Sequence, residues 1–143
     1  LVMKAATFKR EIQHIKNLRK QLLIGLQSNI PNILINGDMD SRLEGNLNIS
    51  IPNINGEALI MQLGKISVST GSACTSSIIA PSHVLKALGL SDELAYSTIR
   101  FGIGRFNTNK DIETAIELVS TVVQKLKNNR KTQQKENNHE LIH

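Results

Sequence analysis

Apolar residues recur at helical spacing near both ends of the chain. Near the start they stand three or four residues apart, with lysines and arginines between them, at Phe8, Ile12, Ile15, Leu18, Leu22 and Leu26. This period predicts an amphipathic helix over about residues 2–28 with one buried face. Near the end, Thr108 to Asp111 resembles a capping box, with Asp in place of the usual Glu. It predicts the start of a second helix, whose apolar stripe is Ile112, Ala115, Ile116, Val119, Val122, Val123 and Leu126.

The segment between these helices predicts a small sheet. Leu47, Ile49 and Ile51 alternate with polar residues, which favours a strand with one buried face. Shorter runs predict further strands at residues 33–35, 66–69 and 98–103. Short helices are expected at residues 57–63, ended by Gly64, and at 82–88, and Ser91 is expected to cap a further helical start. Together these elements predict a compact α/β fold, a small sheet with long helices on one side.

Composition divides the chain into one domain and a tail. Residues 1–127 have enough aliphatic side chains for a single core, whereas residues 128–143 are mostly Asn, Gln, Lys and Glu. We therefore predict a mostly disordered polar tail. No apolar run approaches the roughly 18 residues that span a bilayer, so we expect no membrane association. A single cysteine excludes an internal disulfide and favours the cytoplasm or an organelle matrix.

The formal net charge of +5 is concentrated at the two ends of the chain. Residues 1–20 hold six Lys or Arg against one Glu, and residues 125–143 hold five against two. Aromatic residues that could stack on bases make up only 3% of the chain. Nucleic-acid binding needs a contiguous basic face, so solvated helix surfaces explain this pattern more simply.

The only cysteine, Cys74, lies in a run of small and hydroxylated residues: Ser69, Thr70, Gly71, Ser72, Ala73, Thr75, Ser76 and Ser77. Glycine, serine and threonine favour turns over regular structure, so the run predicts a loop that exposes the thiol. The alternative is an inert buried cysteine, because free cysteine is often a small core residue. From the residues alone, such a loop is compatible with a nucleophilic enzyme, a sulfur carrier or no function.

Three segments closely resemble the cysteine desulfurases that supply sulfur for iron–sulfur cluster assembly, within the class V aminotransferases. They are residues 69–76 around Cys74, residues 81–89, and residues 99–106 around Arg100. Residues 46–50 and 56–60 also resemble that family, and the resemblance covers about residues 8–127 in order.

The resemblance implies a fold-type I enzyme that depends on pyridoxal phosphate (PLP), with a large cofactor-binding domain and a smaller one. This chain is similar to the C-terminal small domain, so PLP is expected to be bound by a large domain that the chain lacks. The family further implies a homodimer, L-cysteine as substrate and an iron–sulfur scaffold protein as sulfur acceptor. Sulfur removal would give L-alanine and a persulfide on the enzyme.

The resemblance implies functional roles for two residues, Cys74 and Arg100. Cys74 matches the cysteine that receives the persulfide, which requires a thiolate. A transient iron–sulfur ligand role for Cys74, shared with the scaffold, is also implied. Arg100 matches the arginine that holds the substrate carboxylate through two parallel hydrogen bonds. Without the resemblance, Arg100 would be interpreted as an edge-strand arginine in a surface ion pair.

The chain also departs from the family. Ala80 replaces a Glu, and Tyr96 stands where the family commonly has His. The family's PLP lysine follows a histidine, but no such pair occurs here, and Lys4, Lys65 and Lys86 have other contexts. A docking segment for the scaffold that carries a Trp is absent as well. The alternative function is therefore a remnant or thiol and persulfide carrier without PLP chemistry. The start at Leu1, within a helix pattern, suggests a piece of a longer chain.

Overall fold

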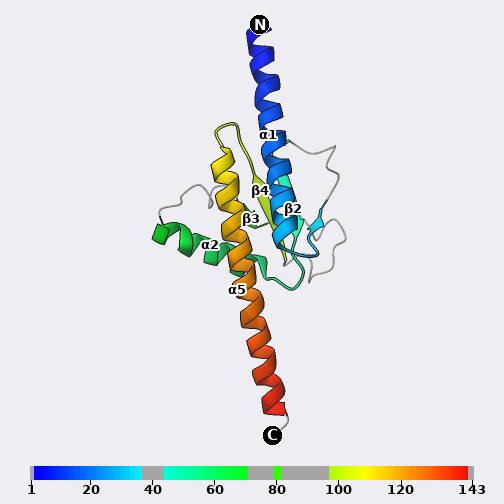
Figure 1. Ribbon diagram of the computed structural model, residues 1–143, viewed down its shortest axis with the longest axis vertical. Helices are drawn as coiled ribbons and strands as arrows, with labels where there is room; N and C mark the ends of the chain where they lie inside the picture. Colours follow the sequence, from blue (N-terminus) through cyan, green and yellow to red (C-terminus); the bar gives the residue numbers. More distant parts are fainter. Residues whose placement is uncertain (1, 37–43, 71–78, 82–96, 142–143) are drawn as a thin grey trace.

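A computed structural model describes residues 2–36, 44–70, 79–81 and 97–141. The elements follow one another in the order α1 (Val2–Asn29), β1 (Leu34–Ile35), β2 (Asn46–Ser50), α2 (Gly56–Thr70), β3 (Ile79–Pro81), β4 (Thr98–Gly102) and α5 (Asn109–Leu141). The C-terminal half of α1 lies beside the N-terminal half of α5, and the two helices extend in opposite directions beyond the sheet (Figure 1).

Two Pro-Asn pairs turn the chain at the ends of regular elements. Asn32 and Asn53 each follow a proline and have φ of 64° and 66°. Proline fixes the first central residue of such a turn, and asparagine tolerates the left-handed region at the second. The first turn ends α1 and leads into β1, and the second leads from β2 towards α2. The first turn thus leads from α1 into β1, which pairs with β2.

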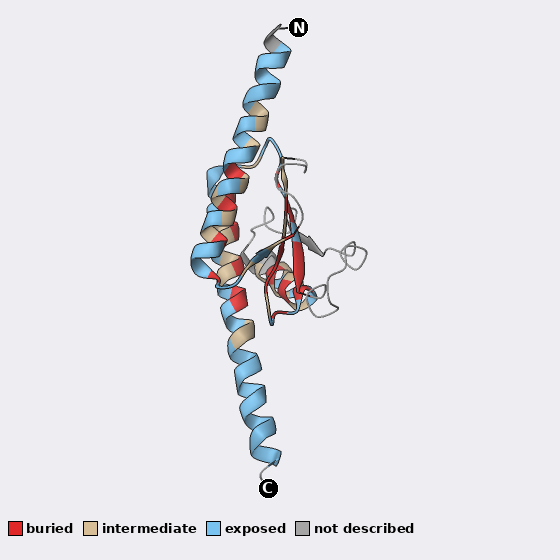
Figure 2. Cartoon of the chain, turned by 90° about the vertical axis from the view of Figure 1, so that its right-hand side faces the viewer, coloured by how far each residue is buried: buried red, intermediate tan, exposed pale blue. Residues whose placement is uncertain are grey.

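The four strands form one antiparallel sheet in the order β1-β2-β4-β3. Strand β4 is therefore an interior strand, with β2 on one side and β3 on the other. The register pairs Leu47 with Phe101 and Ile49 with Ile99 across β2 and β4. Because side chains alternate between the faces of a strand, these four apolar residues share one face. Helices α1 and α5 cover that face, while α2 packs against α5 and β3 (Figures 1 and 2).

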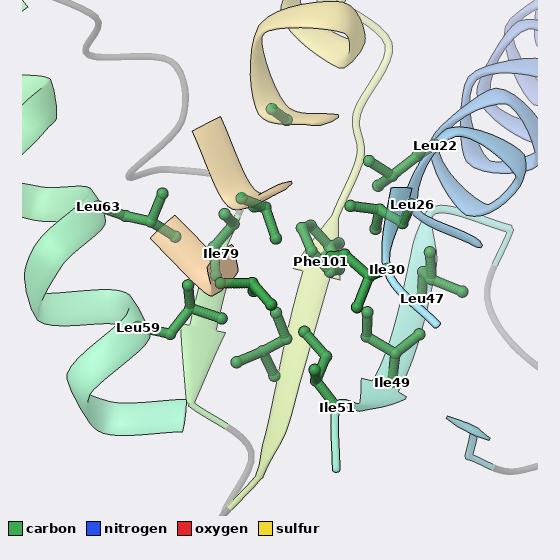
Figure 3. Close-up of a cluster of buried hydrophobic side chains, with 14 of the residues drawn as sticks. Leu22, Leu26, Ile30, Leu47, Ile49, Ile51, Leu59, Leu63, Ile79 and Phe101 are labelled. Atoms are coloured by element: carbon green, nitrogen blue, oxygen red, sulfur yellow. The ribbon is translucent and has the colours of Figure 1, made fainter. Parts of the chain in front are cut away.

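The apolar face and the helices enclose a single core of aliphatic side chains and one phenylalanine. Phe101 is fully buried at its centre, and leucines of α1 and α2 approach it from two sides (Figure 3). The predicted stripe of α1 is buried only in its second half, at Leu18, Leu22 and Leu26. Phe8, in the first half, is 62% exposed. The expected α/β fold with helices on one side of a small sheet is confirmed.

The structure differs from the sequence prediction in the segment before Cys74. A strand is expected at residues 66–69 after a helix that ends at Gly64, but α2 continues without a break to Thr70. Outside the backbone of α2, no atom lies within 4 Å of a Cβ built on Gly64, so this position has room for a side chain. The buried side chains of Leu59 and Leu63, with the half-buried Ile66, continue the helical spacing past Gly64. The β-branched residues around Ile66 favour a strand, but the packing of these three side chains against the core outweighs that preference.

The prediction of a disordered tail from residue 128 is wrong for residues 128–141, which continue α5 to Leu141. These residues are mostly polar and form no apolar stripe, so the helix there is exposed on all sides (Figure 2). Strand β3 is an element that the sequence did not predict, because its three residues are too short for a period. The predicted helix at residues 82–88 and the cap at Ser91 lie outside the described residues.

The start of α5 has the predicted capping box. The Thr108 hydroxyl accepts a hydrogen bond from the Asp111 amide at 3.2 Å, and the Asp111 carboxylate accepts one from the Thr108 amide at 3.0 Å. In the parts of the chain that the structure describes, no helix combines the length and the apolar character needed to cross a membrane.

Candidate functional site

Arg100 lies at the middle of β4 on the face of the sheet opposite the core. Its neighbours in β4, Ile99 and Phe101, are fully buried, whereas Arg100 itself is exposed. Asn48 of β2 stands directly across from it on one side, and Ala80 of β3 on the other. The strand alternation thus places the exposed Arg100 on the face opposite the core, beside the carboxamide of Asn48.

Arg100 does not lie on an edge strand, as its alternative interpretation assumed. The strand that carries it is interior rather than an edge, because β3 pairs with its outer side. Among the residues that the structure describes, none forms an ion pair with this guanidinium. A planar cation held on a rigid strand can bind a carboxylate through two parallel hydrogen bonds. The arrangement is compatible with the expected substrate contact.

A row of polar side chains crosses the same face beside Arg100. The Asn36 amide donates a hydrogen bond to the Ser50 hydroxyl at 2.9 Å, and the hydroxyls of Ser50 and Thr98 are 2.6 Å apart. All three residues are buried. The sequence analysis did not single them out. The signal was present, because Ser50 and Thr98 alternate with the buried isoleucines of β2 and β4.

The segment around Cys74 lies between two described elements, α2 and β3. Ser69 and Thr70, which the sequence analysis assigned to the loop, are the last residues of α2. Gly71, Ser72, Ala73, Cys74, Thr75 and Ser76 lie outside the described residues. The chain re-enters the described part at β3, which pairs directly with the strand that carries Arg100. The roles of Cys74 and Arg100 therefore stay predictions. In the sequence Cys74 precedes β3, the strand that pairs with the Arg100 strand.

Other residues considered in the sequence analysis have structural contacts or lie elsewhere. The Arg105 guanidinium is 4.0 Å from the Glu11 carboxylate and stacks on Phe106, 4.7 Å from the ring centroid. The His14 Nε2 atom is 2.8 Å from the Asn107 carbonyl oxygen, which links α1 to the turn before α5. Three further residues are outside the described part: His83, Lys86 and Tyr96.

The described residues do not fit a PLP site. A Schiff base needs a lysine that is held against the cofactor, with its pKa lowered by burial or neighbouring charge. Lys4 and Lys65 are exposed, and the other described lysines also lie on exposed faces except Lys127, which is half-buried on α5. Within the described ranges, no three His, Cys, Asp or Glu side chains are grouped for a metal ion.

Comparison with known proteins gives the family. Residues 1–115 match the family described as aminotransferase class-V. The chain belongs to this family. Enzymes of this family depend on PLP.

Several curated relatives of the chain are cysteine desulfurases. The chain is 53% identical over 122 residues to the cysteine desulfurase IscS of Ruthia magnifica, which covers 85% of this chain and 30% of that protein. It is 48% identical over 113 residues to the mitochondrial cysteine desulfurase of Arabidopsis thaliana, covering 79% of this chain and 25% of that protein. The chain thus spans less than a third of the length of these relatives. The predicted resemblance is confirmed.

Solved structures agree with the fold. A NifS-like protein from Rickettsia africae superposes with a TM-score of 0.66 at 28% identity, over 79% of this chain and 29% of that one. Another NifS-like protein gives a TM-score of 0.69 at 21% identity, over 85% of this chain and 30% of that one. The second likeness concerns the fold alone.

Proposed function

We propose that this chain is the C-terminal part of a cysteine desulfurase that transfers sulfur from L-cysteine to its own Cys74. The observation that carries the proposal is the 53% identity to a cysteine desulfurase over 122 residues, a span that includes most of this chain. The exposed position of Arg100 on an interior strand supports it. The whole enzyme would include the portion of the relatives that this chain does not span.

The reaction needs one thiol from the substrate and one from the protein. The Cys74 thiolate attacks the substrate sulfur, and the bond between that sulfur and the substrate Cβ breaks. The products are a persulfide on Cys74 and L-alanine, in which a proton replaces the lost sulfur at Cβ. An unperturbed cysteine has a pKa of about 8.5, so only a small fraction is thiolate at neutral pH. The thiol must therefore lose its proton within the site before it attacks.

Arg100 would hold the substrate by its α-carboxylate. The guanidinium is permanently charged and offers parallel N–H groups, so it fixes the orientation of the carboxylate as well as attracting it. Strand β4 is hydrogen-bonded on both sides, which limits the freedom of the Arg100 backbone. This chain would thus supply the carboxylate contact and the sulfur acceptor, and the rest of the enzyme would supply PLP and its lysine.

The partners and compartment follow from the same proposal. The persulfide sulfur would pass to an iron–sulfur scaffold protein, with Cys74 as a transient ligand of the nascent cluster. The complete enzyme would be a homodimer. Relatives include bacterial proteins and mitochondrial ones, so we place the protein in the cytoplasm or an organelle matrix.

A second candidate function is a thiol or persulfide carrier without PLP chemistry. It is favoured by one observation, the absence of a suitable lysine among the described residues. The two candidates differ in what the chain does alone with L-cysteine. A carrier would accept sulfur from an external persulfide donor, and it would produce no alanine in any complex.

The test joins this chain to the remaining part of the Ruthia magnifica relative and measures alanine and sulfide from L-cysteine. Cys74→Ser should retain the PLP absorbance and lose sulfide release, because serine cannot accept sulfur. Arg100→Ala should raise KM for L-cysteine steeply, while thermal unfolding changes little. Sulfide release by Cys74→Ser at the parent rate would disprove the role of Cys74. Failure of the parent protein to form alanine would favour the carrier.

A further inference from the structure

Strands β2 and β4 approach most closely at the pairs on the polar face. Beyond the end of β2, the Ile51 amide donates to the Ser97 carbonyl at 3.0 Å, so this pair is of the hydrogen-bonded kind. In an antiparallel sheet the two kinds of pair alternate. The next pair, Ser50 with Thr98, is therefore non-hydrogen-bonded, with Cα atoms about 4.5 Å apart and side chains close together. Its two hydroxyls are within hydrogen-bonding distance, at 2.6 Å.

Two residues further along both strands, the pair of Asn48 and Arg100 has the same geometry. Its side chains project from the same face as Ser50 and Thr98, because residues i and i+2 of a strand share a face. The Ser50–Thr98 pair and the Asn48–Arg100 pair are thus neighbours on the polar face of the sheet. Any change in the spacing or twist at Thr98 is transmitted to Arg100 through one intervening residue.

The hydroxyl pair is also tied to the third strand. Asn36, at the end of β1, donates its side-chain amide to Ser50 at 2.9 Å and its backbone amide to the Asn48 carbonyl at 2.9 Å. Asn36 therefore forms hydrogen bonds with one residue of each pair, Ser50 and Asn48. Ser50 is 0% exposed, Thr98 3% and Asn36 8%, so water does not compete for these bonds. A buried hydroxyl that loses its partner is costly, which makes this arrangement selective for one register.

We propose that Thr98 and Ser50 are positioning residues for Arg100, which act through the hydroxyl bond that fixes β4 against β2. The proposal rests on the proposed substrate role of Arg100. The guanidinium is exposed, and the parts of the chain that the structure describes hold no ion pair to it, so the strand is what orients its side chain. A slip of one residue would turn Arg100 into the apolar face, and a smaller shift would misalign the two hydrogen bonds to a carboxylate.

The experiment uses the complete enzyme made by joining this chain to the rest of the Ruthia magnifica relative. Thr98→Val keeps the shape of the side chain and removes the hydroxyl. We expect KM for L-cysteine to rise about threefold to tenfold, the range that one hydrogen bond supports, with kcat changed less than twofold. Thr98→Ser should restore the parent KM. Thr121→Val makes the same chemical change on an exposed face of α5 and should leave both constants unchanged.

A double-mutant cycle identifies the route of the effect. If Thr98 acts through Arg100, Thr98→Val should change KM less than twofold in an Arg100→Ala background, because the group being positioned is gone. The same rise in both backgrounds, or no rise in the first, would overturn the proposal. If Arg100→Ala alone leaves KM unchanged, the substrate role itself fails, and the positioning role fails with it.

A folding control keeps the test decisive. If Thr98→Val does not fold, as judged by the loss of its cooperative thermal transition, Ser50→Ala removes the other hydroxyl of the pair and takes its place in the cycle. The KM values expected for Ser50→Ala are the same as those given above for Thr98→Val. A Ser50→Ala enzyme with parent KM would contradict the proposal.

Discussion

At the scale of the residue, Gly45 is a position where the described surroundings leave no room for a side chain. A Cβ added there would overlap the Ile103 carbonyl oxygen, and the Ile15 side chain lies 3.4 Å away. The Gly45 carbonyl also accepts a hydrogen bond from the Ile103 amide at 2.8 Å. The glycine is therefore needed for close backbone approach, since it lets the start of β2 lie against the end of β4.

We predict that Gly45→Ala destabilises the fold by about 1–3 kcal/mol, the usual cost of inserting a methyl group where no space exists. The obstacle is backbone, which cannot rotate away as the end of a side chain can. Urea unfolding followed by circular dichroism measures the free energy of unfolding. A variant as stable as the parent would show that β2 and β4 do not meet at this point.

At the scale of the element, α2 is the helix whose extent the sequence misjudged. A glycine within a helix normally lowers its stability, and here Gly64 is followed by β-branched residues. The packing of Leu59 and Leu63 on the core holds the helix on both sides of it. The consequence is that the segment with Cys74 follows the end of a helix rather than the end of a strand.

Gly64→Ala should stabilise the protein by about 0.5–1 kcal/mol, because alanine favours a helix and the added methyl group meets no atom within 4 Å. This variant is the counterpart of Gly45→Ala, with the same change and the opposite sign. It is measured by the same urea titration. A loss of stability instead would indicate that Gly64 ends the helix, as the sequence alone predicted.

The outer part of α5 has few contacts with the body of the protein. The Arg130 guanidinium donates a hydrogen bond to the Asn53 carbonyl at 3.0 Å, in the turn before α2. Residues 134–141 are exposed on every side. A helix without a packed face has little stability of its own beyond its attachment to the preceding turns.

Deletion of residues 135–143 should therefore change the free energy of unfolding by less than about 0.5 kcal/mol, as expected for exposed positions. The helical signal in circular dichroism should fall with the removed residues. Leu126→Ala, at a half-buried position packed against the core, serves as the control and should be destabilising. A large loss of stability on truncation would reveal contacts of the terminal turns with the body.

At the scale of the whole molecule, the sheet separates two environments. One face is covered by α1 and α5 and forms the core, whereas the other carries the polar row and Arg100. The chain spans about 30% of its desulfurase relatives, and its described lysines are placed on exposed surfaces apart from the half-buried Lys127. The described residues therefore offer no buried lysine for PLP.

We predict that the chain alone does not bind PLP as a specific Schiff base and does not turn over L-cysteine. A specific Schiff base needs a lysine held against the cofactor, whereas the described lysines lie on exposed surfaces apart from the half-buried Lys127. The measurement combines absorbance in the internal-aldimine band, borohydride reduction and intact mass. Stoichiometric trapping at a single lysine would contradict the prediction.

The sequence by itself determined the elements that have a clear period or a local signal. The helical stripe at both ends, the alternation in β2 and β4, and the Thr108 to Asp111 capping box each depend on neighbouring residues. The motif around Cys74 and the residues around Arg100 also pointed to the family, which the comparisons confirm. These features are local, so no contact across the fold was needed to identify them.

Tertiary structure decided the rest. Helix α2 passes Gly64 because its leucines pack on the core, and β3 exists because it pairs with β4. The same pairing makes the Arg100 strand interior. The polar row of Asn36, Ser50 and Thr98 joins residues from three strands that are far apart in sequence. Their meeting depends on sheet order and register, which arise from long-range packing that no single segment specifies.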